Sequence, residues 1–162
     1  IEETLRQLNI CKLLQSKGVK IMVENIGHIT LDKISTHSKL LSKFNAPIMP
    51  LGPLPTDAAI NEDHIANAIG ASFAAHVGCA HIINCVTRYE HPKSAITQDV
   101  TIEAIRAAKV AAHIADLSRN INEANLYDTS ITNNRVKEHC CFADSNNCTR
   151  CSTVCPLKLT SI

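Results

Sequence analysis

Near the beginning of the chain stands the segment VKIMVENIGH, residues 19–28, in which an apolar run gives way abruptly to polar residues. Three of its first five residues are β-branched, which predicts a short buried strand that ends at Glu24. Apolar residues recur at helical spacing on both sides of this strand, over residues 5–14 and 31–41. The segment therefore predicts a strand between two helices, the unit from which parallel sheets are built.

The same order of strand and helix recurs twice further along the chain. Residues 46–51 predict a second strand, interrupted by prolines, and residues 61–73 predict a helix capped by Asn61. Residues 80–86 predict a third strand, and residues 99–118 a long helix. The expected apolar faces of these two helices consist of Ile65, Ala68, Ile69, Ser72 and Phe73, and of Ile102, Ile105, Ala108, Val110, Ala112 and Ile114. The first helix also carries small residues that would allow close approach to a sheet: Ala66, Ala68, Gly70, Ala71, Ala74 and Ala75.

Three consecutive units of this kind predict an α/β fold with a parallel sheet and right-handed crossovers. Either part of a doubly wound sheet or half of a (β/α)8 barrel fits this pattern. No G-x-G-x-x-G sequence follows a predicted strand, so nothing favours a dinucleotide-binding fold. The chain begins at Ile1 and enters a helix with no signal peptide, so we expect a fragment of a longer protein.

Composition excludes several classes of protein. The formal net charge is +1 and aromatic residues make up 3% of the chain, so neither a basic face nor a base-stacking platform for nucleic acid is expected. No run approaches the ~18 apolar residues of a transmembrane helix, so no membrane partner is expected. The chain is therefore expected to act on a small molecule or to bind a protein.

The placement of the eight cysteines is informative. Cys11, Cys79 and Cys85 are scattered through apolar segments, where we expect them to pack, and the other five crowd into residues 140–155. A disulfide scaffold would spread its cysteines, so crowding favours a metal or cluster site in a reducing compartment such as the cytoplasm. Beyond Asn120 the composition turns polar, which predicts a linker before this tail.

The tail cysteines have the spacing Cys148-x2-Cys151-x3-Cys155 followed by proline, the last two intervals of a ferredoxin motif. Three thiolates can hold three irons of a [4Fe–4S] cluster and leave the fourth iron open. Zinc is the alternative, and spacing alone does not choose between the two. The fourth ligand of a zinc site would be His139, Cys140 or Cys141.

Polar side chains follow the end of each predicted strand. Glu24 and His28 follow the first, Asp57 the second, and Glu90 and His91 the third. Because the carboxyl ends of parallel strands share one rim, these side chains form a candidate metal or acid–base site, although polar residues are also ordinary in loops. The histidines on predicted helices are expected at the surface or at helix ends instead: His64, His76 and His113.

Four segments together resemble one family. Residues 22–28, MVENIGH, are similar to its M-[IV]-E-G-P-G-H turn, and residues 51–57, LGPLPTD, to its L-G-P-L-T-T-D. Residues 86–91, VTRYEH, are similar to V-T-P-K-E-H, and residues 109–117, KVAAHIADL, to K-I-A-A-H-A-A-D-L. With the cysteine tail, they resemble the C-terminal part of the phosphomethylpyrimidine synthase family, radical S-adenosylmethionine enzymes of thiamine biosynthesis.

This resemblance implies a fold and an activity. Residues 1–120 would form the C-terminal half of a (β/α)8 barrel, and residues 121–162 a linker and cluster-binding tail. The substrate would be aminoimidazole ribotide, rearranged by a 5′-deoxyadenosyl radical to the hydroxymethylpyrimidine phosphate of thiamine. The resemblance also implies an upstream half of the barrel and a homodimer in which each tail reaches the active site of the other protomer.

The resemblance also implies residue roles. Glu24 would contact substrate, while His28 and His91 would hold a second metal, zinc or another divalent ion. Met49 stands where the family has a substrate-contacting tyrosine. The [4Fe–4S] cluster, which binds S-adenosylmethionine, would be held by Cys148, Cys151 and Cys155.

The chain departs from the family pattern at several positions. Asn25-Ile26 replaces Gly-Pro, Met49 lacks the tyrosine hydroxyl, and the gap between Cys151 and Cys155 is one residue shorter than in the family's C-x2-C-x4-C. Two alternatives therefore stay open. One is the related 5-hydroxybenzimidazole synthase, which uses the same ribotide for the lower ligand of a cobamide. The other is a non-catalytic paralogue with a structural zinc tail.

Overall fold

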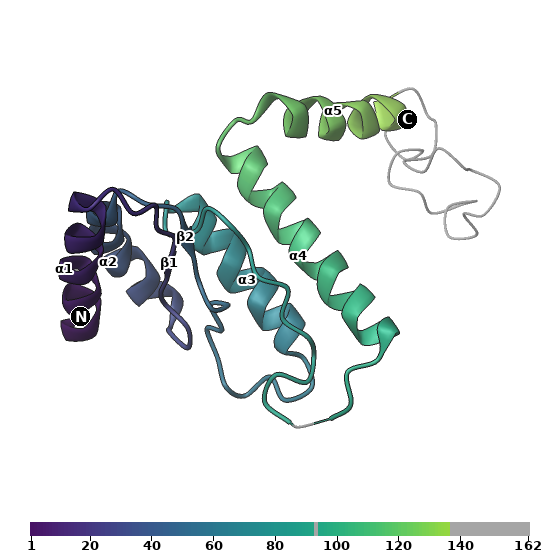
Figure 1. Cartoon of the computed structure of the whole chain (residues 1–162). Coiled ribbons are helices and arrows are strands. Elements are labelled where there is room, and N and C mark those ends of the chain that lie inside the picture. Colours follow the sequence, from purple (N-terminus) through teal and green to yellow (C-terminus); the bar gives the residue numbers. More distant parts are fainter. Residues whose placement is uncertain (93, 137–162) are drawn as a thin grey trace. The chain divides into compact units, whose positions relative to one another are not determined.

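The computed structural model of the chain describes residues 1–92 and 94–136. Its elements are α1 (Glu2–Ser16), β1 (Val23–Glu24), α2 (Leu31–Leu41), the 3-10 helix η1 (Ser42–Phe44), β2 (Ile48–Met49), α3 (Asp63–His76), α4 (Gln98–Ser118) and α5 (Asn122–Val136) (Figure 1). The chain divides into a unit of Ile1–Arg119 and a second that begins at Asn120. Where a linker was expected, the second unit begins with helix α5.

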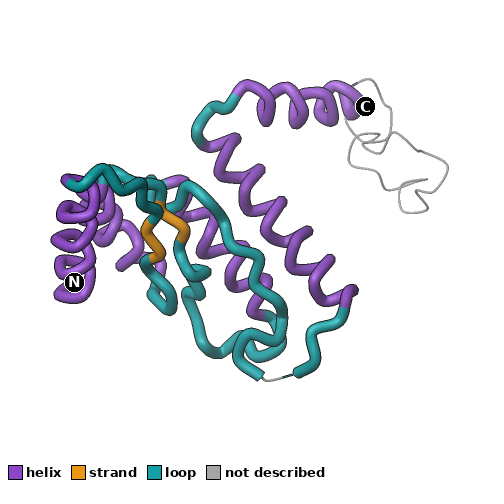
Figure 2. The backbone as a smooth tube through the Cα atoms, in the orientation of Figure 1, coloured by secondary structure: helices purple, strands orange, loops and turns teal. Residues whose placement is uncertain are grey.

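The two strands form a short parallel sheet, with α2 in the connection between them (Figure 2). Val23 pairs with Ile48 and Glu24 with Met49. Val23 and Ile48 are buried, whereas Glu24 is exposed and Met49 half-buried, because successive side chains of a strand point to opposite faces. A mixed α/β arrangement is confirmed in this part of the chain, and the half-barrel stays a prediction.

The third strand, expected at residues 80–86, does not form. The segment lies beside β2, but the amides of His81 and Ile82 both donate to the Ile48 carbonyl, at 2.8 and 3.2 Å. The Ile48 amide donates in turn to Nδ1 of His81 at 3.1 Å. The Ile48 amide is thus bonded to a side chain, whereas a regular β ladder would need it to donate to a backbone carbonyl of the neighbouring segment. The segment is therefore attached to the sheet as an irregular strip.

The main hydrophobic core lies between the sheet and helices α1 to α3. Its largest fully buried apolar side chains are Ile34, Leu41, Phe44 and Ile48. Cys79 joins this core, and burial raises the pKa of its thiol to about 11, so it packs as a small apolar residue. The scattered cysteines do not all behave as expected, because Cys85 is exposed.

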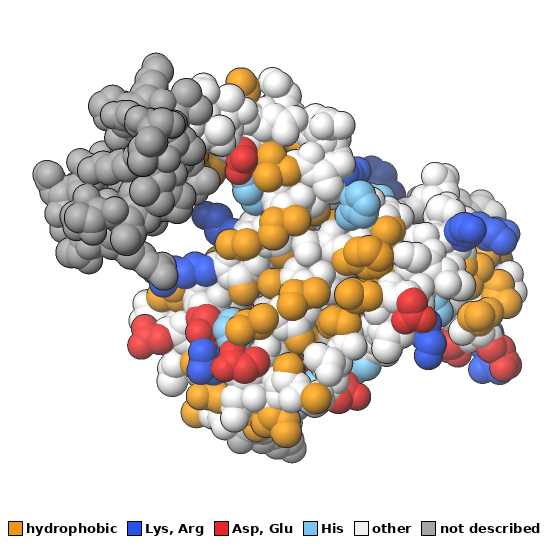
Figure 3. Space-filling view, turned by 180° about the vertical axis from the view of Figure 1, so that it is seen from behind, with side chains coloured by type: hydrophobic (Ala, Val, Ile, Leu, Met, Phe, Trp, Pro, Cys, Tyr) orange, Lys and Arg blue, Asp and Glu red, His pale blue; other side chains and the backbone are white. Residues whose placement is uncertain are grey.

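Helices α3 and α4 pack mainly through small residues, as expected for α3, and not through the isoleucines of the expected apolar faces. Their buried positions hold small or polar residues: Asp63, His64, Ala66, Asn67, Gly70, Ala71, Ala74 and Ala75 in α3, and Ala104, Ala108, Ala111 and Ala115 in α4. The large aliphatic residues expected to be buried are exposed, with Ile65 at 49% and Ile69 at 52%. Figure 3 shows hydrophobic side chains gathered on one face of the molecule.

The reason is geometric: side chains no larger than a methyl group let two helices approach closely, and larger ones at the same positions would hold them apart. Within the described residues, no helix has both the length and the apolar character of a membrane span.

Candidate metal centre

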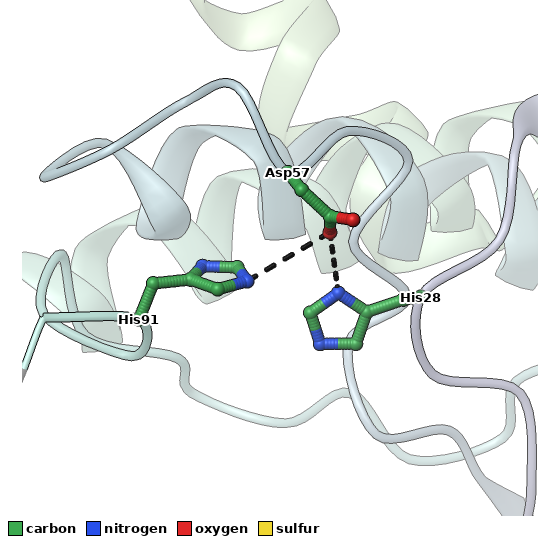
Figure 4. Close-up of side chains that lie close together, drawn as sticks. All are labelled: His28, Asp57 and His91. Carbon is green, nitrogen blue, oxygen red and sulfur yellow. Dashed lines mark hydrogen bonds and ion pairs between the residues drawn. The ribbon is translucent and has the colours of Figure 1, made fainter.

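Three loops bring their polar residues to one place (Figure 4). His28 follows β1, Asp57 follows β2, and His91 follows the irregular strip. One ligand atom from each lies within 4.8 Å of the others. Glu90, expected at the same rim, is exposed and has no place in this group. The structure thus brings together three of the residues that the sequence places at strand ends.

Backbone contacts hold the first two loops side by side. His28 and Leu54 form an isolated parallel bridge beyond the sheet. In it, the Leu54 amide donates to the Gly27 carbonyl, and the Ile29 amide donates to the Leu54 carbonyl, both at 3.2 Å. Helix α3 supports the second loop from behind, because a Cβ built on Gly70 would stand 2.0 Å from the Pro53 carbonyl oxygen. The loop that carries Asp57 therefore packs directly against the backbone of α3 at Gly70.

His91 is fixed by a buried carboxylate. Asp63, in the first turn of α3, accepts from the His91 amide at 3.0 Å and lies 2.6 Å from its Nδ1. The Asp63 side chain is only 1% exposed. Since Nδ1 is occupied, the other ring nitrogen, Nε2, faces the group and lies 3.7 Å from Oδ1 of Asp57. The sequence pattern assigns Asp63 no such role, because acidic residues are common in the first turn of helices.

His28 occupies the exposed side of the group. Its Nδ1 lies 2.6 Å from Oδ1 of Asp57, and this contact holds the pKa of the Asp57 carboxyl below its ordinary value. The side chains of His28 and Asp57 are 48% and 73% exposed. The rings of His28 and His91 meet edge to face, with centroids 5.0 Å apart. One anionic oxygen therefore faces two imidazoles that solvent can reach.

A second ion-pair group holds the loop of His91 to α4. Arg88 binds Glu103 through two hydrogen bonds of 2.6 and 2.5 Å, and this contact is the largest cause that lowers the pKa of Glu103. His64 lies beside it, with Nε2 3.5 Å from the Glu103 carboxylate. His64, expected at the surface or at a helix end, lies at the N-terminal end of α3 with its side chain buried, 8% exposed. His64 follows Asp63 into the packed first turn of α3.

The residues expected to contact substrate lie on the two strands. Glu24 and Met49 are partners in the sheet register. The departure at Asn25-Ile26 is accommodated by α1, because the side-chain Nδ2 of Asn25 donates to Oε1 of Gln7 at 2.5 Å. Ile26 adopts φ of +54°, unusual for a β-branched residue, and its amide donates to Oδ1 of Asn25 at 2.9 Å. The polar turn before His28 is thus shaped by side-chain hydrogen bonds.

The donor set fits a divalent metal ion. Two imidazoles and a carboxylate suit zinc or iron(II), and both ions commonly use such a set with positions left open for other ligands. A carboxylate behind the distal nitrogen of a ligating histidine, as Asp63 is behind His91, is the usual second contact in such sites. The cysteines expected to bind a cluster, Cys148, Cys151 and Cys155, lie outside the described residues.

Residues 1–140 match the Radical SAM ThiC family. The chain is similar to the phosphomethylpyrimidine synthase of Carboxydothermus hydrogenoformans, with 41% identity over 126 residues, 76% of this chain and 29% of that protein. It is 32% identical to phosphomethylpyrimidine synthase 1 of Methanosarcina barkeri, over 98% of this chain and 42% of that protein. It is 38% identical to the phosphomethylpyrimidine synthase of Clostridium tetani, over 82% of this chain and 29% of that protein.

The chain therefore spans less than half the length of these relatives. The matched region contains all three loops of the candidate metal centre and most of the helices. The resemblance seen in residues 22–28, 51–57, 86–91 and 109–117 is confirmed by the family match and by identities of 32% to 41%. This chain belongs to the Radical SAM ThiC family.

Proposed function

We propose that the chain is the C-terminal part of a radical S-adenosylmethionine lyase that rearranges aminoimidazole ribotide to hydroxymethylpyrimidine phosphate. The observation that carries this proposal is the meeting of His28 and His91, from loops 63 positions apart in sequence (91 − 28), in a chain of this family. Two histidines held this way leave a bound metal open to other ligands, as a site that faces substrate or cofactor requires.

Each strand-end residue has a role in this proposal. Glu24, exposed at the end of β1, offers its carboxylate to donor groups of the substrate. Met49 lies beside it on β2 and presents an apolar thioether where the family resemblance expects a tyrosine hydroxyl. His28 and His91 hold a zinc or another divalent ion through imidazole nitrogen.

The tail completes the site in this proposal. Cys148, Cys151 and Cys155 would hold a [4Fe–4S] cluster with one open iron. A cluster bound there would supply the electron for reductive cleavage of S-adenosylmethionine. In this proposal the tail reaches the other protomer of a homodimer. The parallel sheet of β1 and β2 continues into an upstream half of a (β/α)8 barrel, which supports the remaining substrate contacts.

The test uses the full-length protein, reconstituted with iron and sulfide without oxygen. We expect about four irons and four acid-labile sulfides per chain, and 5′-deoxyadenosine when reductant, S-adenosylmethionine and the ribotide are added. Cys151→Ala should lose both, while Cys85→Ala, a change at an exposed cysteine outside the tail, should keep both. A protein that binds zinc alone and forms no 5′-deoxyadenosine would instead be the non-catalytic paralogue.

A second candidate activity rests on Met49. Met49 pairs with Glu24 in the sheet register, so a tyrosine hydroxyl is missing beside the carboxylate that we propose to contact the substrate. A lost hydrogen bond at that point favours an altered product, such as the 5-hydroxybenzimidazole made from the same ribotide. Mass spectrometry of the product distinguishes the two activities. If the pyrimidine is absent and 5-hydroxybenzimidazole appears, the second candidate replaces the first.

A further inference from the structure

We propose that Asp57 is the third protein ligand of the metal at His28 and His91, and that Asp63 is the residue that positions His91 for it. This inference rests on the metal site of the proposed function and extends it. It changes a site of two histidines into a site of two histidines and one carboxylate. Such a site carries one negative charge of its own and binds a divalent ion more tightly than two neutral imidazoles do.

The position of Asp57 supports its role as a ligand. Its Oδ1 lies between the rings, 2.6 Å from Nδ1 of His28 and 3.7 Å from Nε2 of His91. Figure 4 shows one carboxylate oxygen turned toward both histidines. The loop that carries Asp57 is supported by α3 through the close approach of Pro53 to Gly70. The carboxylate is therefore held where the two imidazoles converge.

The surroundings leave access for a ligand that the protein does not supply. His28 and Asp57 line a cavity of ≈ 400 Å³, together with Thr30 and Lys33 at the start of α2. The side chains of His28 and Asp57 are 48% and 73% exposed. A further ligand can reach them from solvent, which is what distinguishes a site for chemistry from a closed structural site.

Asp63 acts on the metal through His91. It occupies Nδ1 and the backbone amide of that residue together, so both the rotation of the ring and the nitrogen left free are fixed. With Nδ1 protonated toward Asp63, Nε2 keeps its lone pair for a metal. His28 has no comparable buried partner among the described residues. The site thus has one fixed imidazole and one that adjusts.

The competing explanation is that Asp57 only accepts a hydrogen bond from His28. An isosteric change separates the two, because an asparagine oxygen can still accept from Nδ1–H but carries no charge and is a poor metal ligand. In the ligand role, Asp57→Asn loses most zinc affinity. In the hydrogen-bond role, zinc affinity changes little.

The experiment uses the full-length protein with the five tail cysteines of residues 140–155 changed to serine, so that no tail thiolate can bind zinc. This protein is stripped of metal and titrated with zinc against a chromophoric chelator. We expect Asp57→Asn to weaken zinc binding by more than about 100-fold, beyond the usual effect of residues behind a ligand, and Asp57→Glu to recover part of it. Glu90→Gln, which removes an exposed carboxylate next to His91, should leave the affinity unchanged. Equal affinity with and without Asp57→Asn in this protein would overturn the proposal.

X-ray absorption at the zinc edge tests the positioning role. Asp63→Asn should weaken zinc binding by about 10- to 100-fold. At saturating zinc it should also reduce the number of imidazole ligands from two to one, a change that a loss of stability alone does not produce. Two imidazoles retained in Asp63→Asn would contradict that role. The zinc titration needs no cluster, so its outcome is separate from the test of the proposed function. If the unaltered protein forms no 5′-deoxyadenosine, the proposed function is overturned. Zinc binding through Asp57 would still sustain this inference.

Discussion

The two faces of helix α3 differ in a way that hydrophobicity does not explain. The inner face buries Asp63 and Asn67 completely and brings Gly70 against the backbone of a loop. The outer face carries Ile65 and Ile69, each about half exposed. Burial on this helix therefore follows hydrogen-bond partners and close backbone approach, and the two isoleucines are left outside, whereas Phe73 packs against the core.

The first prediction tests the inner face at its closest contact. Gly70→Ala would place a Cβ 2.0 Å from the Pro53 carbonyl oxygen, a distance that real atoms do not adopt. In a free helix the same change would stabilise by about 1 kcal/mol. Here we expect a loss of about 3 kcal/mol or more in the free energy of unfolding, measured by denaturant titration.

The control is Gly27→Ala, since a Cβ there would stand 3.6 Å from its nearest neighbour, the Leu51 carbonyl. That variant should unfold close to the unaltered protein. If Gly70→Ala proves as stable as Gly27→Ala, then close backbone approach does not determine which residues α3 buries on its inner face.

The second prediction concerns the buried amide on the same face. Asn67 Nδ2 donates to the Asn84 carbonyl at 2.9 Å, and Asn84 Nδ2 donates to the Pro50 carbonyl at 3.0 Å, so these residues attach the irregular strip to α3 and β2. Asn67→Ala leaves a carbonyl without its partner and should cost about 1–3 kcal/mol. Thermal unfolding measures this loss of stability, with Ser72→Ala on the other face of α3 as the control. Equal melting temperatures for the two variants would speak against a structural role of the amide.

The third prediction tests the outer face. Ile69→Ser should change the stability of the full-length protein by less than about 0.5 kcal/mol, as is usual for exposed positions. The comparison of the two faces fails here if the loss reaches about 2 kcal/mol, because such a cost is typical of a buried isoleucine. Denaturant titration of the full-length protein is the measurement.

The smallest effect is expected at the ion pair that holds the loop of His91. Arg88 lowers the pKa of Glu103 below its ordinary value of 4.5, so the pair stabilises the fold above that pH and loses its effect as pH falls through the lowered pKa. Glu103→Gln should therefore lower the melting temperature slightly at neutral pH, and this difference should disappear as pH falls through the lowered pKa of Glu103. A difference that persists at low pH would show that Glu103 contributes through packing.

The sequence predicted helices α1 to α4 well because their apolar periodicity is strong, and α2 and α4 begin and end within one residue of the expected bounds. Helix α5 was missed because its polar composition is typical of a linker. The irregular strip was missed because the bond that breaks its ladder comes from the His81 side chain. No pattern of β-branched residues carries that information. Close packing of α3 through its small residues was predictable from the sequence, but the isoleucines expected on the apolar faces of α3 and α4 are exposed. Periodicity shows which residues share a stripe of a helix, but not which stripe meets a neighbour.

The site was more predictable than the faces. A parallel topology directs strand ends to one rim, and this is enough to place His28, Asp57 and His91 together. Asp63 was not predictable from its type or spacing, because its role depends on the position of His91 in space, 28 residues later (91 − 63). The sequence alone thus indicates the residues that we propose as ligands, and the structure is needed to find the carboxylate that contacts one of them.

One helix supports both loops that converge on the candidate metal centre, with Asp63 holding His91 and Gly70 seating the loop of Asp57. A small shift of α3 along its axis would therefore move two of the three donors at once. In the proposed metal site, the spacing of the ligands therefore depends on the position of this one helix. Substitutions on the inner face of α3 that displace the helix would then change metal affinity, even where they touch no donor atom.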